Sequence, residues 1–144
     1  MRELLDVMAE LEERWVLRRL SDIDLSVVPP WLVEGLSTAS RYEHSIHVAH
    51  MAAIVAKRLR LDEVLLALAG LLHDAGCGPF PHITDELTRI LTGRRGHEEN
   101  VEFILSKSPD GELSLLERVV DIDEIFQIVS GGHALSPLIS GPSI

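Results

Sequence analysis

The stretch LAGLLHDAGCGPFPH, residues 68–82, decides both the fold of this chain and the place of its chemistry. It continues an uncharged run, residues 64–72, whose apolar side chains cover every face of a helix. Such a run predicts the central and most buried helix of a globular domain. Asp62 is the expected N-cap of this helix, and Gly76 is its expected end, because glycine is the usual residue just past a helix C-terminus.

His73 and Asp74 continue this apolar helix directly, and their polarity at that place requires a reason. A carboxylate at a helix C-terminus is disfavoured by the helix macrodipole, and burial without a partner makes it costlier still. The nearest basic residues in the sequence, Arg60 and Arg89, are both distant. We therefore expect a cation beside Asp74. A simple cap that turns the chain into the following glycines is the alternative.

The remainder of the chain also has helical periodicity, and no alternating strand pattern of useful length is present. Besides the central helix, the expected helices span residues 2–20, 30–36, 42–59, 83–91 and 97–106, and two short helices that break near Asp121 follow. We expect an all-α fold, a compact helical bundle of about six to seven helices that forms a single domain over residues 1–144.

Composition and charge exclude several classes of protein. The formal net charge of −10 argues against strong binding to nucleic acid or to an anionic membrane, although a metal or a local cluster can still hold an anionic substrate. The longest apolar run has nine residues, far fewer than the ~20 that a membrane span needs. The charged N-terminus is no signal peptide, and Cys77 is the only cysteine, so we expect a cytoplasmic protein without an internal disulfide.

Helix phase separates the histidines into inward and outward groups. His44 falls on the expected inward stripe of the 42–59 helix, whereas His50 falls on its outward face. The stripe consists of Val48, Met51, Ala52, Val55 and Leu59. His97 falls on the inward stripe of the 97–106 helix. Inward histidines on two helices and a His-Asp pair on a third suit a divalent metal such as Zn, Fe, Mn or Ni, whereas ordinary core histidines are the alternative.

Three sequence blocks, in this order, resemble the HD-domain phosphohydrolases. They are RYEHSIHVAHMA at residues 41–52, ALAGLLHDAGCGPFPH at 67–82 and GHEE at 96–99. The branch that they resemble most is that of the deoxynucleoside triphosphate triphosphohydrolases, whose pattern is R-[FY]-E-H-S, then L-L-H-D-x-G-H-G-P-F-S-H, then H-E. A lone HD dipeptide would carry no weight, but the three blocks at these spacings are specific.

The resemblance implies a metal centre. His44, His73 and Asp74 would be three of the four protein ligands of a divalent ion, with Mn, Fe, Zn, Mg, Ni and Co all open. The family takes its fourth ligand, an aspartate, from a later helix. Asp121 or Asp123 would have to replace it here, or it would lie beyond Ile144. We expect this chain to be truncated at its C-terminal end, and a degenerate member with an incomplete site is the alternative.

The resemblance also implies roles for residues around the metal. Arg41 would hold a substrate phosphate, and His82 and Asp85 would line the phosphate pocket or support the catalytic histidine. His97 would be the catalytic acid or base, with Glu98 or Asp85 orienting it.

Simpler roles compete for three of these residues. Arg41 can instead pair with Glu43 or a helix dipole, and His82 can cap the 83–91 helix. Asp85 lies opposite the apolar stripe of that helix, which predicts a solvated side chain. The stripe consists of Ile83, Leu87 and Ile90.

Cys77 departs from the pattern, because the triphosphohydrolases usually have a second pocket histidine at its position. A thiol is a poor donor to phosphate and carries no positive charge. The resemblance thus implies a phosphohydrolase acting on a nucleotide or related phosphate ester, dNTP triphosphohydrolase-like, with further copies of the chain as allowed partners. A non-catalytic HD scaffold that senses a nucleotide or a metal is the alternative, and a helical interaction domain is the third.

Overall fold

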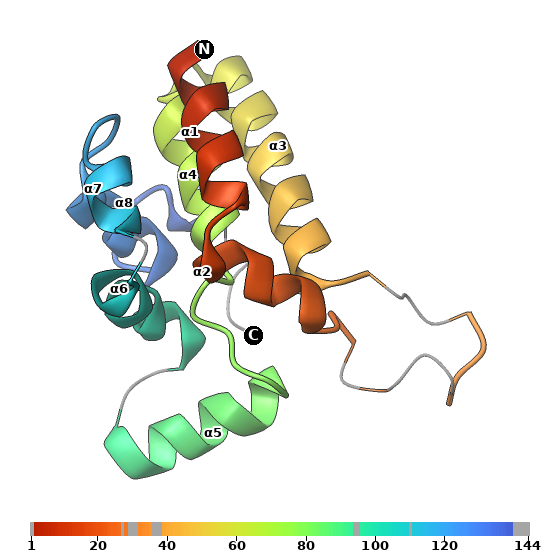
Figure 1. The fold of residues 1–144 in the computed structure, drawn as a ribbon. Coiled ribbons are helices and arrows are strands. Elements are labelled where there is room, and N and C mark those ends of the chain that lie inside the picture. Colours follow the sequence, from red (N-terminus) through yellow and green to blue (C-terminus); the bar gives the residue numbers. More distant parts are fainter. Residues whose placement is uncertain are drawn as a thin grey trace.

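The computed structural model describes residues 2–26, 28, 32–35, 39–93, 96–109 and 111–139, except for the side chains of residues 2–4, 81, 82, 98 and 99. These residues form the expected all-α fold (Figure 1). In chain order the α-helices are α1 (Arg2–Glu12), α2 (Trp15–Arg18), α3 (Arg41–Leu59), α4 (Glu63–Leu72), α5 (Pro81–Thr92), α6 (His97–Lys107), α7 (Glu112–Leu116) and α8 (Ile122–Val129). Two 3-10 turns, η1 (Arg19–Asp22) and η2 (Ser136–Leu138), complete them.

The described part of the chain has eight α-helices, against an expected bundle of about six to seven, and two of them come from the predicted helix over residues 2–20, which is divided. Arg14 adopts an extended conformation between α1 and α2. This break lets α1 bury Leu11 and the following turns bury Val16 and Leu20 in the same core. Of the short helix predicted at 30–36, only residues 32–35 are described, and they form a turn.

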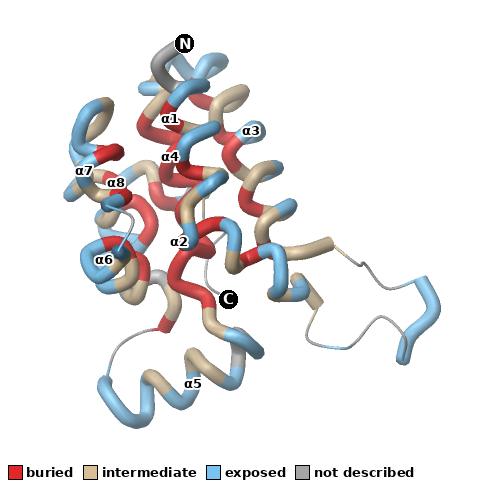
Figure 2. Tube along the Cα trace, in the orientation of Figure 1, coloured by how far each residue is buried: buried red, intermediate tan, exposed pale blue. Residues whose placement is uncertain are grey.

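α4 is the most buried helix, as the apolar run predicted. Residues 65–72 are all buried, with α3 on one side and α7 and α8 on the other (Figure 1, Figure 2). The side chain of Asp62 accepts hydrogen bonds from the backbone N–H groups of Val64 and Leu65 at 2.9 and 3.0 Å, which confirms the predicted N-cap.

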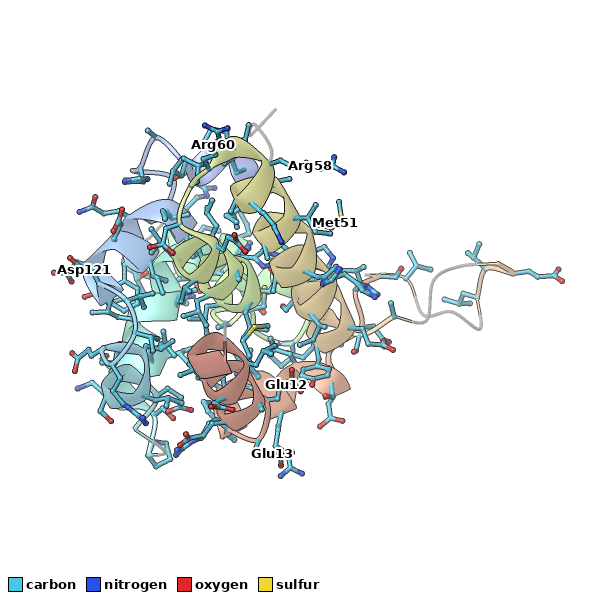
Figure 3. The ribbon with its side chains drawn as sticks, turned by 90° about the horizontal axis from the view of Figure 1, so that it is seen from above. Glu12, Glu13, Met51, Arg58, Arg60 and Asp121 are labelled. Atoms are coloured by element: carbon cyan, nitrogen blue, oxygen red, sulfur yellow. The ribbon has the colours of Figure 1, made fainter. Side chains whose placement is uncertain are left out.

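The predicted inward stripe of α3 is wrong in part, because Ala52 is buried but Val48 and Val55 are only partly buried. Its buried residues are Arg41, Ser45, Ala49, Ala52 and Ala56, whereas Met51 and Leu59 are 58% and 57% exposed. In Figure 3 the labelled Met51 lies on the outer side of α3. Close approach between α3 and α4 explains the difference.

Gly70 and Ala49 mark that close approach. A Cβ placed on Gly70 would lie only 3.1 Å from the Cα of Ala49. The contact face of α3 therefore selects small side chains, and the larger apolar residues are left at its margin. Apolar size alone thus misidentifies the inner face of this helix.

α4 ends at Leu72, earlier than the predicted end at Gly76. His73 is its C-cap with a right-handed helical conformation, and the residues from there to Gly76 form a turn. Gly76 is therefore not a left-handed helix terminator. His73 and Asp74 therefore lie in the turn after α4 rather than within the helix, and their side chains can contact neighbouring helices.

α5 lies at one end of the molecule, apart from the α3–α4 pair (Figure 2). Its apolar stripe was expected to face inward, but Ile83, Leu87 and Ile90 are all more than half exposed. No helix among the described residues has the length and apolar content that crossing a membrane requires.

Candidate metal centre and catalytic dyad

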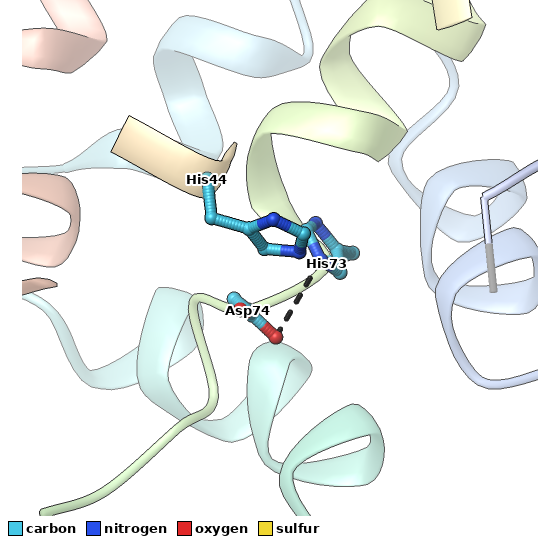
Figure 4. A group of neighbouring side chains, drawn as sticks. All are labelled: His44, His73 and Asp74. Atoms are coloured by element: carbon cyan, nitrogen blue, oxygen red, sulfur yellow. Dashed lines mark ion pairs between the residues drawn. The ribbon is translucent and has the colours of Figure 1, made fainter. Parts of the chain in front are cut away.

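Two imidazoles and a carboxylate meet where the start of α3 passes the turn after α4. The ligand atoms of His44, His73 and Asp74 all lie within 4.8 Å of one another (Figure 4). The rings of His44 and His73 meet edge to face, with centroids 5.2 Å apart. The Nε2 atom of His73 lies 3.5 Å from an Asp74 carboxylate oxygen.

The backbone of α4 fixes the ring of His73. Its Nδ1 lies 2.7 Å from the carbonyl oxygen of Gly70. Because a carbonyl only accepts, this contact assigns the proton to Nδ1 and leaves the lone pair of Nε2 facing the cluster. Metal-binding histidines are commonly oriented by such a second hydrogen bond.

His44 is held in its neutral form. Burial lowers its pKa, and the neighbouring His73 and Arg41 lower it further, which outweighs the opposite effect of Asp74. Neutral imidazole is the form that coordinates a metal. The local environment therefore favours the ligand state of this side chain.

Asp74 is buried, and its cationic partner is Arg41. The guanidinium Nη1 of Arg41 donates to Oδ2 of Asp74 at 2.8 Å. Burial opposes ionisation, but His73 and Arg41 hold the pKa of Asp74 below its usual value. The expectation that a cation offsets this carboxylate is thus met by an arginine that α3 brings from a distant part of the sequence. The other oxygen, Oδ1, faces His73.

These residues fit a divalent metal. Two imidazole nitrogens and one carboxylate oxygen are a common donor set for such ions. His73 has its lone pair directed into the cluster, His44 is favoured as the neutral base, and Asp74 is ionised with one oxygen left for a cation. This arrangement leaves coordination positions for water or substrate.

His97 and Asp85 form a second functional group beside this cluster. Nδ1 of His97, the first residue of α6, lies 2.6 Å from Oδ2 of Asp85 on α5. Nε2 of the same ring lies 3.8 Å from Oδ1 of Asp74. The prediction of a solvated Asp85 is therefore wrong. The apolar stripe of α5 faces solvent, and its polar face turns toward His97.

Two glycines allow α6 to begin so close to the cluster. A Cβ on Gly76 would overlap the carbonyl group of His97. Gly96 has φ +121°, which side chains rarely tolerate, and a Cβ there would meet the carboxylate of Asp85 at 3.2 Å. In the sequence, Gly76 and Gly96 indicate only turns. Their role in the close approach of α6 to the turn that carries Asp74 follows from the packed structure alone.

Arg19 was missed by the sequence reading. Its Nη1 donates to the carbonyl of Cys77 at 2.6 Å, and its Nη2 donates to the carbonyl of Ala75. The guanidinium also lies 5.4 Å from the ring centroid of Trp15. Burial lowers the pKa of Arg19. This side chain fixes the turn that carries Asp74, and it comes from a segment more than fifty residues away.

Cys77 is fully buried and touches the same carboxylate. Its Sγ lies 3.5 Å from Oδ1 of Asp74 and 3.5 Å from Nη1 of Arg41. Burial and Asp74 raise the pKa of Cys77, so the thiol is neutral. Cys77, Asp74 and His97 form a second set of ligand atoms within 4.8 Å of one another.

Four predicted site residues remain, and two of them have described side chains. The side chains of His82 and Glu98 lie outside the described residues. Asp121 caps α8 by accepting a hydrogen bond from the N–H of Asp123 at 3.0 Å, and both are exposed (Figure 3). Neither belongs to a metal-capable group among the described residues. His50 is exposed, as predicted.

Comparisons with known proteins agree with this geometry. Residues 41–137 match the HD domain family. A deoxyguanosinetriphosphate triphosphohydrolase-like protein of Geobacter sulfurreducens is 39% identical over 70 residues, which are 48% of this chain and 18% of that protein. One of Caldanaerobacter subterraneus subsp. tengcongensis is 35% identical over 107 residues, which are 72% of this chain and 31% of that protein.

A solved structure is also similar. The crystal structure of a hypothetical protein from Aquifex aeolicus matches with a TM-score of 0.77 and 26% identity, over 94% of this chain and 38% of that one. The chain thus spans less than a third of the length of the two curated relatives. The family match covers well over half of the chain and includes the metal-capable cluster and the His97–Asp85 dyad, so this chain belongs to the HD domain family.

Proposed function

We propose that this chain carries the metal-binding and catalytic residues of a phosphohydrolase that acts on a nucleotide or a related phosphate ester. HD domains are in general metal-dependent phosphohydrolases. The observation that carries the proposal is the His97–Asp85 dyad, whose free imidazole nitrogen lies 3.8 Å from the Asp74 carboxylate.

His44, His73 and Asp74 would hold a divalent cation, whose chemistry is to polarise a phosphoryl oxygen and to acidify a water molecule. Asp85 accepts a hydrogen bond from Nδ1–H of His97, which leaves Nε2 to take a proton from the attacking water. The same carboxylate stabilises the imidazolium that results, and that imidazolium then donates its proton to the leaving group.

Arg41 would bind a phosphate oxygen of the substrate. Its Nε is buried and has no hydrogen-bond partner among the described residues, while Nη1 is committed to Asp74. A buried guanidinium N–H without an acceptor is costly. A phosphate oxygen would supply the acceptor, and the guanidinium would offset charge that develops on it.

We further propose a deoxynucleoside triphosphate as the substrate, on the strength of the names of the curated relatives. The second candidate function, a metal or nucleotide sensor on an HD scaffold, is favoured by one observation. Cys77 is neutral and buried against Asp74, so it adds no positive charge to a phosphate pocket.

Metal content and turnover together distinguish these functions. The purified chain is loaded with Mn²⁺ or Co²⁺, analysed for metal, and then tested against dGTP, dATP and p-nitrophenyl phosphate. We expect His73→Ala to lose both its Mn²⁺ and its turnover, and His97→Ala to keep its Mn²⁺ but lose roughly 10²–10⁴-fold in turnover. His50→Ala, an exposed histidine of the same helix as His44, is the matched control and should change neither.

Each outcome has a distinct reading. Metal that is bound and lost in His73→Ala, without turnover of any substrate by the wild type, would favour the sensor. A wild type that binds no metal after loading would contradict both the metal-dependent phosphohydrolase and the metal sensor.

A further inference from the structure

We propose that Asp74, Cys77 and His97 form a second metal position, next to the one held by His44 and His73, with the Cys77 thiolate as a ligand. The inference rests on the proposed function in one respect, since Asp74 would serve both positions. The thiolate would select a borderline-soft cation such as Zn²⁺ or Co²⁺ over Mn²⁺ or Mg²⁺.

The distances suit a shared carboxylate oxygen. Oδ1 of Asp74 lies 3.5 Å from Sγ of Cys77 and 3.8 Å from Nε2 of His97. All three ligand atoms lie within 4.8 Å of one another. Ligands of one tetrahedral ion, each about 2.0–2.3 Å from the metal, are separated by distances of this size. Only small side-chain shifts would be needed to close the set.

The orientation that makes Nε2 of His97 a base also makes it a ligand. Because its single lone pair cannot serve both roles, a cation at this second position would prevent His97 from acting as the base. Its Nδ1 lies 2.6 Å from the carboxylate of Asp85, so the Nε2 lone pair points toward Asp74. A carboxylate that accepts from one ring nitrogen while a metal takes the other is a recurring arrangement of metal sites. His73 is oriented in the same way by the carbonyl of Gly70.

Cys77 is held rigidly in place. Arg19 binds its carbonyl at 2.6 Å, and its N–H donates to the carbonyl of Asp74 at 2.9 Å. The thiol is therefore presented to the carboxylate rather than packed as a mobile core group. Binding of the cation would release the thiol proton to solvent, and the thiolate and carboxylate together would balance the added charge.

Arg41 sets the selectivity of this position. Its Nη1 lies 3.5 Å from Sγ of Cys77, so it repels any dication that enters. Hard ions such as Mn²⁺ and Mg²⁺ bind mainly through electrostatic attraction, so this repulsion weakens their binding. For Zn²⁺ or Co²⁺, the bond to the thiolate offsets the repulsion. We therefore expect two equivalents of Zn²⁺ or Co²⁺ but a single equivalent of Mn²⁺.

The test is metal stoichiometry together with the absorption spectrum of the Co²⁺-loaded chain. The wild type should bind two Co²⁺ and show a thiolate-to-cobalt charge-transfer band in the near ultraviolet. Cys77→Ala and the nearly isosteric Cys77→Ser should each bind one Co²⁺ less, and both should lack the band, because Cys77 is the only cysteine of the chain. Thermal melting of both variants checks that they fold. His44→Ala is the matched control, expected to lose the other equivalent and to keep the band.

A single equivalent in the wild type, or two equivalents with no thiolate band, would overturn the second position. These outcomes are separate from a failure of the proposed function. If the chain binds one cation and turns over substrate, the proposed hydrolase is supported and the second metal position is contradicted. If the chain binds two equivalents with the thiolate band but shows no turnover with Mn²⁺, the second metal position is supported and the hydrolase is contradicted.

Discussion

At the scale of single residues, Asp74 organises the site. One of its oxygens pairs with Arg41, and the other lies within 3.8 Å of His73, Cys77 and His97. A buried carboxylate in such surroundings is stable only while cationic or hydrogen-bonding groups compensate it. Arg41 does so in the metal-free fold, and a bound cation would add to it.

Removal of Arg41 should therefore destabilise the folded chain, and a bound metal should restore part of the lost stability. We expect Arg41→Met to lower the free energy of unfolding by about 3–5 kcal/mol without metal, because it leaves Asp74 buried and unpaired. Zn²⁺ or Mn²⁺ should restore part of that loss. Urea denaturation with EDTA and with each metal measures both values. A loss of equal size in all three conditions would show that no cation compensates Asp74.

The lowered pKa of His44 predicts the pH dependence of the metal-free chain. The unfolded chain takes up a proton on this residue near pH ~6.5, whereas the folded chain does so only at lower pH. The unfolded state thus binds more protons in that interval, so stability should fall as the pH falls from ~6.5 toward the folded pKa. Denaturation midpoints in EDTA should show a weaker decline in His44→Gln than in His50→Gln, the exposed control. Equal declines would contradict the neutral state assigned to His44.

At the scale of elements, the turn after α4 is held from two sides. Arg19 binds its carbonyl groups from η1, and the start of α6 packs against Gly76. The turn therefore couples the N-terminal segment to the position of the His97–Asp85 dyad.

Gly76→Ala should separate metal binding from turnover. The new Cβ would push the backbone of His97 away, while His44 lies on α3 and His73 and Asp74 precede Gly76 in the turn. We expect a stability loss of about 1–3 kcal/mol from overpacking and a larger loss in turnover than in metal affinity. Gly132→Ala is the control, because the added Cβ there would meet no atom closer than 3.7 Å. Unchanged turnover in Gly76→Ala would contradict the role of the close approach.

Arg19→Lys tests the clamp on the same turn. Lysine keeps the charge, but it cannot reach two carbonyl groups with a planar pair of donors. We expect Arg19→Lys to bind metal more weakly than the wild type, and Arg19→Met to bind it more weakly than Arg19→Lys. Calorimetric titration with Zn²⁺ measures this, and the exposed Arg58→Lys serves as control. A metal affinity equal to that of the wild type in both Arg19 variants would show that Arg19 does not position this turn for metal binding.

At the scale of the whole molecule, sequence reasoning located the helices better than their contacts. The predicted bounds of α3, α5 and α6 differ from the observed ones by no more than two residues, because caps and breakers act locally. The inner face predicted for α3 was wrong in part and that predicted for α5 was wrong, since helix-to-helix distance and exposure depend on the packed neighbours. The pairing of Arg41 with Asp74 and the reach of Arg19 are long-range contacts that one sequence does not reveal.

The central claim is that His44, His73 and Asp74 hold a divalent cation beside His97. Its most direct test is anomalous diffraction from crystals of this chain grown with Mn²⁺. We predict a manganese peak at about 2.0–2.3 Å from the nitrogens of both histidines and from Oδ1 of Asp74, the usual range for such ligands. No peak at this cluster, or a peak only at sites away from these three residues, would contradict the account.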